Sequence, residues 1–348
     1  MTVPRTTDIP PVLVLSTGRC GSTMISDLLS RHPAVLSLSE FFVPLGPEAF
    51  AHDSIDGDGF WRILSRQSPA LRAMLRDGIV VDEMLYPYDR PGMRYGLADL
   101  PPMMMVTLPH LTDAPEALYD ALEPVVRARP AMPLADQYRA LFEDLAGRLG
   151  RRVWIERSGG SLMLAAKLLR LFPDARVIHV HRDGRDTAMS MEKHHNFKVL
   201  VGAMKAARRL GVDATRDFTR DRGRQIDVLS QRMIFPFINA RRLAEGVTLS
   251  ELGAFWSLMI GLAREVLDPL PPDRLLTVAF EDVQRAPREQ LQAMIRFIDP
   301  GLDDPAWLDE VSAIPRPARS RAADLPPDVY AALTEACRPG LKALGYSV

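Results

Sequence analysis

Residues 17–23, with the sequence TGRCGST, combine residue types that suit the binding of an anionic group. They lie between the apolar run 11–15 and a stretch from Met24 onward whose apolar residues have helical spacing. Backbone N–H groups at a helix start, glycines that let the backbone come close, and the planar guanidinium of Arg19 all favour an oxyanion. The residues expected to bind it are Thr17, Gly18, Arg19, Cys20, Gly21, Ser22 and Thr23.

A second segment of this kind lies near residue 180. Arg182 follows residues 176–181, which are expected to form a buried strand, and a helical pattern begins at Gly184. Ser190 is eight residues beyond Arg182, which is about two helical turns, so it faces back toward the strand end. Two strand ends that each carry an arginine and helix-start amides can hold two anionic groups of one ligand. A nucleotide with phosphates at both ends of its ribose fits this arrangement.

Other interpretations of the first segment are open. It is not a Walker A loop, because Gly21 stands where that motif has its lysine. This difference, and the lack of an obvious Mg²⁺-holding aspartate after an apolar strand, disfavour a nucleotide-dependent kinase. A nucleotide-binding protein without catalysis is a further alternative, and a plain strand-to-helix turn capped by Ser22 is the structural one.

Three motifs resemble those of the sulfotransferases that use 3′-phosphoadenosine-5′-phosphosulfate (PAPS). Residues 182–185 (RDGR) with Ser190, preceded by LFPDA at 171–175, resemble the family's 3′-phosphate motif. Residues 17–23 resemble its 5′-phosphosulfate loop, and 275–283 (LLTVAFEDV) is similar to its late strand ending in Tyr-Glu-Asp-Leu. The run 157–191 is most similar to the tyrosylprotein sulfotransferases and the related bacterial group.

The resemblance implies in-line transfer of a sulfuryl group from PAPS to an acceptor hydroxyl, without a metal ion and with release of 3′,5′-ADP. It implies that Arg182 and Ser190 bind the 3′-phosphate, with Arg321 as a further phosphate contact before the last helix. Glu40, 21 residues after Arg19, stands at about the interval of the family's general base. Arg157 stands where the tyrosylprotein branch has a lysine that stabilises the departing group. The structural alternatives are a capping or solvent-facing Glu40 and an ion pair of Arg157 with Glu156 or another acidic neighbour.

The histidines are weaker candidates for the general base or for a metal site. The cytosolic sulfotransferases use a histidine as base, but the equivalent positions here, 157–160 (RSGG), contain none, which disfavours His110. His179 and His181 share one face of a strand and suit a metal, yet no third ligand is evident, so core packing is favoured. His194 and His195 are assigned no role.

Composition indicates an α/β enzyme without nucleic-acid or membrane partners. The chain has 348 residues, 47% of them hydrophobic, and a net charge of −1, so no global field attracts nucleic acid. The basic runs 205–209 and 216–224 are interleaved with aspartates, which favours solvated helix faces. Two cysteines without a pairing pattern indicate a reducing compartment. With no signal-peptide pattern and no apolar membrane span, we expect a bacterial cytoplasmic location.

The expected fold class is α/β, a doubly wound parallel sheet flanked by helices, with a P-loop-like sulfotransferase fold and a helical insert. Strands are expected at 11–16, 34–38, 152–156, 176–181 and 274–280, within one domain spanning 1–348. Helices are expected at 64–76, 115–127, 133–149 and 326–344, and segments 41–150 and 197–270 should cover the acceptor site. Met103–Met105 in the insert suit an apolar pocket for a small or lipid-like acceptor, although a core contact is favoured for each. The sequence identifies neither the acceptor nor the oligomeric state.

Overall fold

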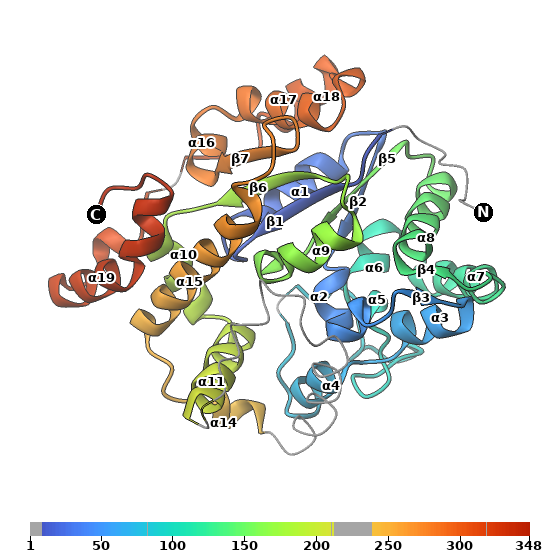
Figure 1. Ribbon diagram of the computed structural model, residues 1–348, viewed down its shortest axis with the longest axis horizontal. Coiled ribbons are helices and arrows are strands. Elements are labelled where there is room, and N and C mark those ends of the chain that lie inside the picture. The colour runs from blue at the N-terminus through green and yellow to red at the C-terminus, as the bar shows by residue number, and fades with distance from the viewer. Residues whose placement is uncertain (1–8, 82, 210, 212–238, 318) are drawn as a thin grey trace.

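A five-stranded parallel sheet forms the centre of the molecule (Figure 1). The computed structural model describes residues 9–81, 83–209, 211, 239–317 and 319–348. The strand order is β2-β5-β1-β6-β7. The strands are β1 (Val12–Ser16), β2 (Val35–Ser39), β5 (Val153–Arg157), β6 (Arg176–His181) and β7 (Leu275–Ala279). Each of the five predicted strands forms, with ends within one residue of the prediction, so the doubly wound parallel sheet is confirmed.

β1 lies at the centre of the sheet, between β5 and β6. Its five residues are all buried. Because successive side chains of a strand point to opposite faces, Leu13 and Leu15 join one hydrophobic cluster and Val12 and Val14 join the other. The sheet is therefore buried on both faces, as continuous apolar strands require.

Helices from distant parts of the chain cover the two faces (Figure 1). The cluster with Val12 is completed by α1 (Ser22–Ser30), α16 (Phe280–Arg285), α17 (Pro287–Ile298) and α18 (Pro305–Val311). The cluster with Leu13 includes α9 (Ala165–Leu171), α10 (Gly184–Glu192), α15 (Leu249–Leu267) and α19 (Pro327–Ala343). The predicted last helix is thus confirmed. No helix of the described residues is both long and apolar enough to cross a membrane.

The segment between β2 and β5 is a mainly helical insert. It contains α2 (Phe42–Leu45), α3 (Gly57–Ser65), α4 (Pro69–Arg76), α5 (Pro102–Met105), α6 (Thr107–Leu111), α7 (Pro115–Arg127) and α8 (Leu134–Arg148). A short antiparallel pair, β3 (Ser54–Ile55) with β4 (Met132–Pro133), was not predicted. The helices predicted at 115–127 and 133–149 are confirmed.

The single helix predicted at 64–76 is wrong. The chain forms α3 and α4 instead, with a break at 66–68. Ser68 caps α4 by accepting a hydrogen bond from the Leu71 amide, and Pro69 occupies the first turn. Proline lacks the N–H that would continue α3, so it suits a helix start and not a helix interior.

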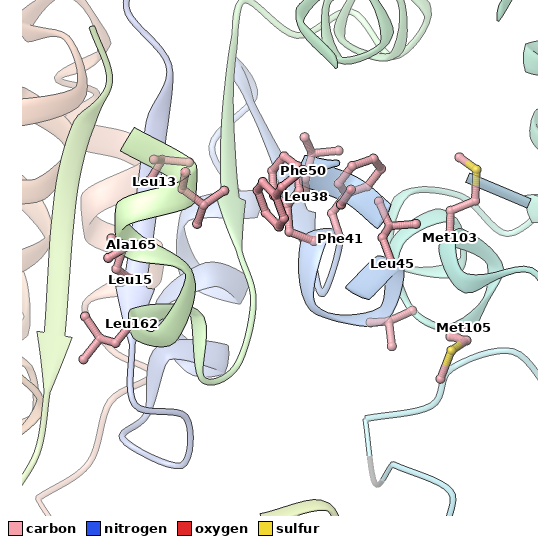
Figure 2. Close-up of a cluster of buried hydrophobic side chains, with 14 of the residues drawn as sticks. Leu13, Leu15, Leu38, Phe41, Leu45, Phe50, Met103, Met105, Leu162 and Ala165 are labelled. Atoms are coloured by element: carbon pink, nitrogen blue, oxygen red, sulfur yellow. The ribbon is translucent and has the colours of Figure 1, made fainter. Parts of the chain in front are cut away.

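Met103, Met104 and Met105 are core residues. Each is at most 1% exposed, and all three belong to the larger hydrophobic cluster, in which Figure 2 shows Met103 and Met105. They pack inside the insert and line no open surface. The favoured alternative of a core contact is confirmed, and the methionines no longer support an apolar acceptor pocket.

The segment after β6 is helical where the structure describes it. It comprises α10, α11 (His195–Arg209), α14 (Ala240–Ala244) and α15. α15 begins with a capping box in which Thr248 and Glu251 satisfy each other's backbone N–H groups. The basic run 216–224 and the aspartates around it lie outside the described residues.

Candidate active site

The carboxyl ends of the five parallel strands lie at one edge of the sheet, and each is followed by a polar or charged group of interest. Glu40 follows β2, Arg157 ends β5, and Arg19 follows β1. Arg182 follows β6 and Glu281 follows β7. Open α/β sheets bind ligands at this edge. The predicted site residues are thus gathered by the sheet from across the whole sequence.

The loop between β1 and α1 has the backbone shape of an anion cradle. Gly18, Arg19 and Gly21 have φ angles of 75°, 57° and 85°. Gly21 precedes α1 in the left-handed conformation, and no described side chain caps that helix. The first N–H groups of α1 therefore lack a side-chain acceptor, as an anion site requires.

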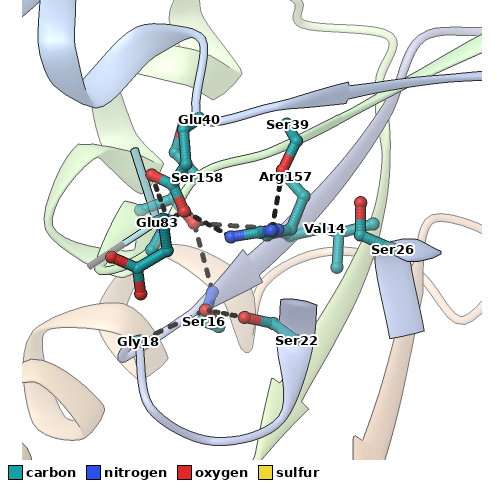
Figure 3. A network of polar contacts seen from close by, with 12 residues as sticks. Val14, Ser16, Gly18, Ser22, Ser26, Ser39, Glu40, Glu83, Arg157 and Ser158 are labelled. Atoms are coloured by element: carbon teal, nitrogen blue, oxygen red, sulfur yellow. Dashed lines mark hydrogen bonds and ion pairs between the residues drawn. The ribbon is translucent and has the colours of Figure 1, made fainter. Parts of the chain in front are cut away.

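Serine hydroxyls hold this loop closed. Ser16 Oγ donates to Ser22 Oγ at 3.1 Å and accepts from the Gly18 amide at 3.2 Å. Figure 3 shows Ser16 between Gly18 and Ser22. The Ser22 hydroxyl thus stabilises the conformation of the loop. Its partner Ser16 was not among the predicted site residues.

The remaining predicted residues of the loop differ in their solvent exposure. Thr17 is buried and donates to the Gly18 carbonyl at 3.0 Å. Cys20 is fully buried, and its thiol donates to the Val180 carbonyl at 3.4 Å. Burial raises the pKa of Cys20. Its side chain belongs to the core, so its backbone alone faces the loop, whereas Thr23 is exposed on α1.

Two phenylalanines pack against the loop glycines. A Cβ on Gly18 would lie 2.7 Å from Phe197 of α11, and a Cβ on Gly21 would lie 2.1 Å from Phe280. Both glycines are therefore required by space as well as by their positive φ. Phe280 belongs to the predicted motif at 275–283, so this motif supplies a side chain that packs against the loop.

Arg19 is held between two side chains. Its Nε donates to Ser190 Oγ at 3.3 Å, and its Nη1 donates to Glu83 Oε1 at 2.5 Å. From the sequence, Arg19 was expected at the 5′-phosphosulfate of the nucleotide and Ser190 at its 3′-phosphate. In the structure the two side chains are in contact. Glu83 comes from the insert, and its side chain is 23% exposed. No sequence motif had pointed to it.

Glu40 is bound from several sides. Its Oε1 accepts from Arg157 Nη1 and from the Gly159 amide at 2.9 Å, while Oε2 lies 3.0 Å from the same amide. The Glu40 amide in turn donates to the Arg157 carbonyl at 2.7 Å. Figure 3 shows this network beside Glu83. Oε2 is the less engaged oxygen and can accept a further proton donor.

Arg157 is 1% exposed and serves Glu40 directly. Besides Glu40, its guanidinium donates through Nη2 to Ser39 Oγ at 2.7 Å. Its Nε has no partner among the described residues. The ion pair with an acidic neighbour, one of the two predicted alternatives, is present, and the neighbour is Glu40 rather than Glu156.

Arg19 and Glu40 share a backbone feature. Within the residues that the structure describes, they are the two non-glycine positions with positive φ, at 57° and 53°. Such a conformation is unfavourable for a side chain with a Cβ and is often found at functional sites. Thr107 of α6 stabilises the Glu40 turn by donating to the Ser39 and Glu40 carbonyls at 2.9 and 3.2 Å.

The electrostatics of the site favour a proton acceptor with an elevated pKa. Burial raises the pKa of Glu40 and the nearby Glu83 adds to the increase, while Arg157 and the Gly159 amide oppose it. Burial also raises the pKa of the neighbouring Glu156 to about 7. Burial lowers the pKa of His110, which lies in α6 near Asp27 and Arg157.

Arg182 lies over Phe280, with its guanidinium 5.5 Å from the ring centroid. It also approaches Asp186 Oδ2 at 3.7 Å and is 21% exposed. Asp186 Oδ1 accepts from the amides of Arg321 and Ala322 at 2.8 and 3.1 Å. Asp186 therefore brings the two predicted phosphate-binding arginines to one corner of the site.

His179 and His181 lie side by side on β6, with ring centroids 5.7 Å apart. They are 5% and 7% exposed, so the favoured interpretation, core packing, is confirmed. The described residues contain no group of three or more His, Cys, Asp or Glu side chains suited to a metal ion.

The similar structures are sulfotransferases of low sequence identity. The sulfotransferase domain of the Synechococcus PCC 7002 olefin synthase is 17% identical, with a TM-score of 0.43, over 100% of this chain and 98% of that one. The domain from the curacin biosynthetic pathway is 13% identical, with a TM-score of 0.43, over 98% and 99%. The enzyme from Alicyclobacillus acidocaldarius is 14% identical, with a TM-score of 0.39, over 97% of each chain. No curated protein matches this sequence significantly.

One segment of the chain matches a family model. The model of the sulfotransferase family matches residues 104–236. That segment contains Arg157, Arg182 and Ser190, which were selected from their motifs alone. The match agrees with the resemblance drawn from those motifs, and residues 104–236 are similar to the sulfotransferase family.

Proposed function

We propose that this protein transfers a sulfuryl group from PAPS to an acceptor hydroxyl and releases 3′,5′-ADP. The observation that carries the proposal is the alignment of Glu40, Arg157, Arg19 and Arg182 at the ends of four neighbouring strands. This order places a carboxylate at one side of an anion cradle and a separate arginine at the other. A donor with two phosphate-bearing ends and an acceptor beside the carboxylate fits that order.

The residues of the loop fit the 5′-phosphosulfate end of the donor. The glycines give the loop its positive-φ backbone, and the start of α1 lacks a side-chain cap. Arg19 supplies a forked donor at the same place, so charge that develops on the departing phosphate meets fixed positive groups. These groups supply electrostatic stabilisation from the chain itself.

The corner formed by Arg182 and Arg321 fits the 3′-phosphate. Arg182 is held by Phe280 and Asp186 but remains partly exposed, and Arg321 is exposed on the adjoining loop. Two arginines within one corner favour a doubly charged phosphate over a hydroxyl. We assign the selection of PAPS over ATP to this corner.

Glu40 is proposed as the general base. Its carboxylate is oriented by Arg157 and Gly159, while Oε2 retains capacity to accept the proton of an acceptor hydroxyl. The raised pKa of Glu40 makes it a stronger base than an exposed carboxylate. The acceptor hydroxyl then attacks the sulfur in line as its proton passes to Glu40.

Arg157 is proposed to act through Glu40. The resemblance implied direct stabilisation of the departing group, but both terminal nitrogens of Arg157 already bind Glu40 and Ser39. Its contribution is then to orient the base and to keep its charge compatible with burial. Direct contact with the leaving group stays the competing proposal.

The acceptor is proposed to be a hydroxyl-bearing small molecule. A lipid-like acceptor and a cytoplasmic location stay predictions from the sequence, because the methionines that suggested an apolar pocket are core residues.

The first test is calorimetric titration of the purified chain with 3′,5′-ADP, AMP and ATP, each with and without Mg²⁺. Metal-independent binding of 3′,5′-ADP well above that of AMP and ATP supports the proposal. Preferential, Mg²⁺-dependent binding of ATP would refute it in favour of a kinase. Formation of 3′,5′-ADP from PAPS only when a hydroxyl acceptor is added then separates an enzyme from a non-catalytic binding protein.

A further inference from the structure

The last residues of the chain return to the carboxyl ends of β6 and β7. The hydroxyl of Tyr346 donates to Glu281 Oε2 at 2.9 Å and lies 3.0 Å from His181 Nδ1. A phenol has one proton, which here goes to the carboxylate, so Nδ1 of His181 carries a proton and donates to the phenol oxygen. The two rings meet edge to face, with centroids 5.6 Å apart.

Glu281 transmits this contact to the predicted 3′-phosphate segment. Its other oxygen, Oε1, accepts from the Asp183 amide at 2.9 Å. That amide belongs to the peptide that joins Asp183 to Arg182. One carboxylate therefore joins the C-terminal tyrosine to the backbone that presents Arg182, while the preceding Phe280 holds the Arg182 guanidinium.

A second contact links the chain end to the same turn. Arg185 Nη2 donates to the Ser347 carbonyl at 3.1 Å. The same guanidinium binds both carboxylate oxygens of Asp183, at 3.0 Å from Nε and 2.6 Å from Nη2. The turn at Asp183 is thus attached to the chain end through its backbone and through its side chain.

These hydrogen bonds are partly buried. His181 is 7% exposed, and burial lowers its pKa to about 4, so the ring is neutral near pH 7. Burial and the neighbouring Glu281 raise the pKa of Tyr346, so its hydroxyl remains a donor. In such surroundings a lost partner leaves a carboxylate oxygen unsatisfied, which costs more than the same loss in water.

We propose that Tyr346 is a positioning residue for donor selection. Through Glu281 it fixes the Arg182–Asp183 peptide, and so aims Arg182 at the 3′-phosphate of the nucleotide. The inference rests on the proposed function for the identity of that nucleotide. The coupling between Tyr346 and the Asp183 amide is a property of the chain alone and is independent of the proposed function.

The test uses the full-length chain with Tyr346→Phe, which removes the hydroxyl and keeps the ring. The matched control is Tyr138→Phe, since Tyr138 is a buried tyrosine whose hydroxyl donates to the Ala49 carbonyl at 3.0 Å in the insert. Affinity for 3′,5′-ADP and for AMP is measured by calorimetry. Hydrogen exchange of the Asp183 amide is measured in the absence of nucleotide.

We expect Tyr346→Phe to weaken 3′,5′-ADP binding about tenfold, which is the loss of one charge-assisted hydrogen bond. AMP affinity should stay within experimental error, and exchange at Asp183 should accelerate. With PAPS and an acceptor, KM for PAPS should rise with little change in kcat. Glu281→Gln should have the same effects, and the double variant should be no worse than either single one. Tyr138→Phe should leave nucleotide selection and exchange at Asp183 unchanged.

Failure of the inference is distinguishable from failure of the proposed function. If the wild-type chain prefers 3′,5′-ADP to AMP and Tyr346→Phe keeps that preference in full, the inference is overturned and the function stands. An equal loss for both nucleotides overturns it as well. If the wild-type chain does not distinguish the nucleotides, the proposed function fails, and unchanged exchange at Asp183 in Tyr346→Phe then refutes the coupling independently.

Discussion

Arg157, the last residue of β5, binds the carboxylate of Glu40 through its side chain and the amide of Glu40 through its carbonyl oxygen, at 2.7 Å. The end of the neighbouring strand therefore holds the backbone of Glu40, the proposed base, and stabilises the ionised form of its carboxylate. A carboxylate that is mostly buried would otherwise become protonated, because burial favours its neutral form. The arginine limits this increase in pKa without removing it.

Replacement of the proposed base tests its role most directly. Glu40→Gln keeps the size of the side chain but cannot accept a proton, so we expect turnover to fall by about 10²–10⁴-fold. Affinity for 3′,5′-ADP should change little. Glu289→Gln, at an exposed position of α17, is the control for loss of one negative charge. Near-normal turnover in Glu40→Gln would exclude Glu40 as the base and direct attention to His110.

The pH dependence of Arg157→Lys separates the two proposals for this arginine. The variant keeps a positive charge but cannot bind Glu40 and Ser39 through two nitrogens of one planar group. Arg157 lowers the pKa of Glu40, so a weaker partner should let that pKa rise further. The base must be ionised to act, so the acidic limb of the kcat/KM profile should move to higher pH. A fall in kcat with an unmoved limb would instead indicate direct contact with the leaving group.

Glu156 should make the stability of the fold depend on pH. Burial raises its pKa from 4.5 to about 7, so the folded chain binds more protons than the unfolded chain between these values. Stability due to this group is full below about pH 4.5 and is lost as the pH rises through 7, by roughly 3 kcal/mol in all.

The neutral isostere Glu156→Gln checks this dependence. Denaturant unfolding at pH 5 and pH 8 should show the variant gaining stability relative to the wild type as the pH rises. Ser158 Oγ can still donate to the amide oxygen, as it does to Glu156 at 2.5 Å. A difference between the two proteins that is the same at both pH values would show that Glu156 is ionised throughout.

The strands were predictable because each combines an apolar run with flanking turn residues. β1 lies at the centre of a sheet covered on both faces, so its sequence shows little alternation and stands out. The motif residues follow such strands directly, which is why Arg19 and Arg182 could be located. The break at Ser68 was missed because the apolar spacing of α3 and α4 continues across it, and its signal was the local pair Ser68–Pro69.

The partners of the motif residues were harder to predict. Glu83 meets Arg19 from a segment 64 residues away that carries no recognisable motif. Only the packing of the insert over the sheet edge determines that contact. The contact between Arg19 and Ser190 was missed for another reason: helical periodicity gave the direction of Ser190 but not the depth of α10 relative to the loop.

Arg182→Ala tests the 3′-phosphate corner. Removal of one charge-assisted partner should weaken 3′,5′-ADP binding by about tenfold to a hundredfold, with a much smaller effect on AMP. Calorimetry with both nucleotides provides the measurement. Arg338→Ala, at a position of α19 whose side chain is 42% exposed, controls for the lost charge. Equal losses for 3′,5′-ADP and AMP would remove Arg182 from the 3′-phosphate site.

Glu83→Gln tests whether the insert restrains the anion cradle. Glu83 binds the same guanidinium that is proposed to meet the phosphosulfate, and both side chains are about one-quarter exposed, at 23% and 26%. A carboxylate there competes with an incoming anion, so its neutralisation should tighten 3′,5′-ADP binding by about fivefold, which is typical of a partly exposed ion pair. The gain should shrink as salt is added, because salt screens the pair in the wild type. Glu289→Gln should show no such gain. Weaker binding in Glu83→Gln would mean that Glu83 orients Arg19 for the ligand and does not compete with it.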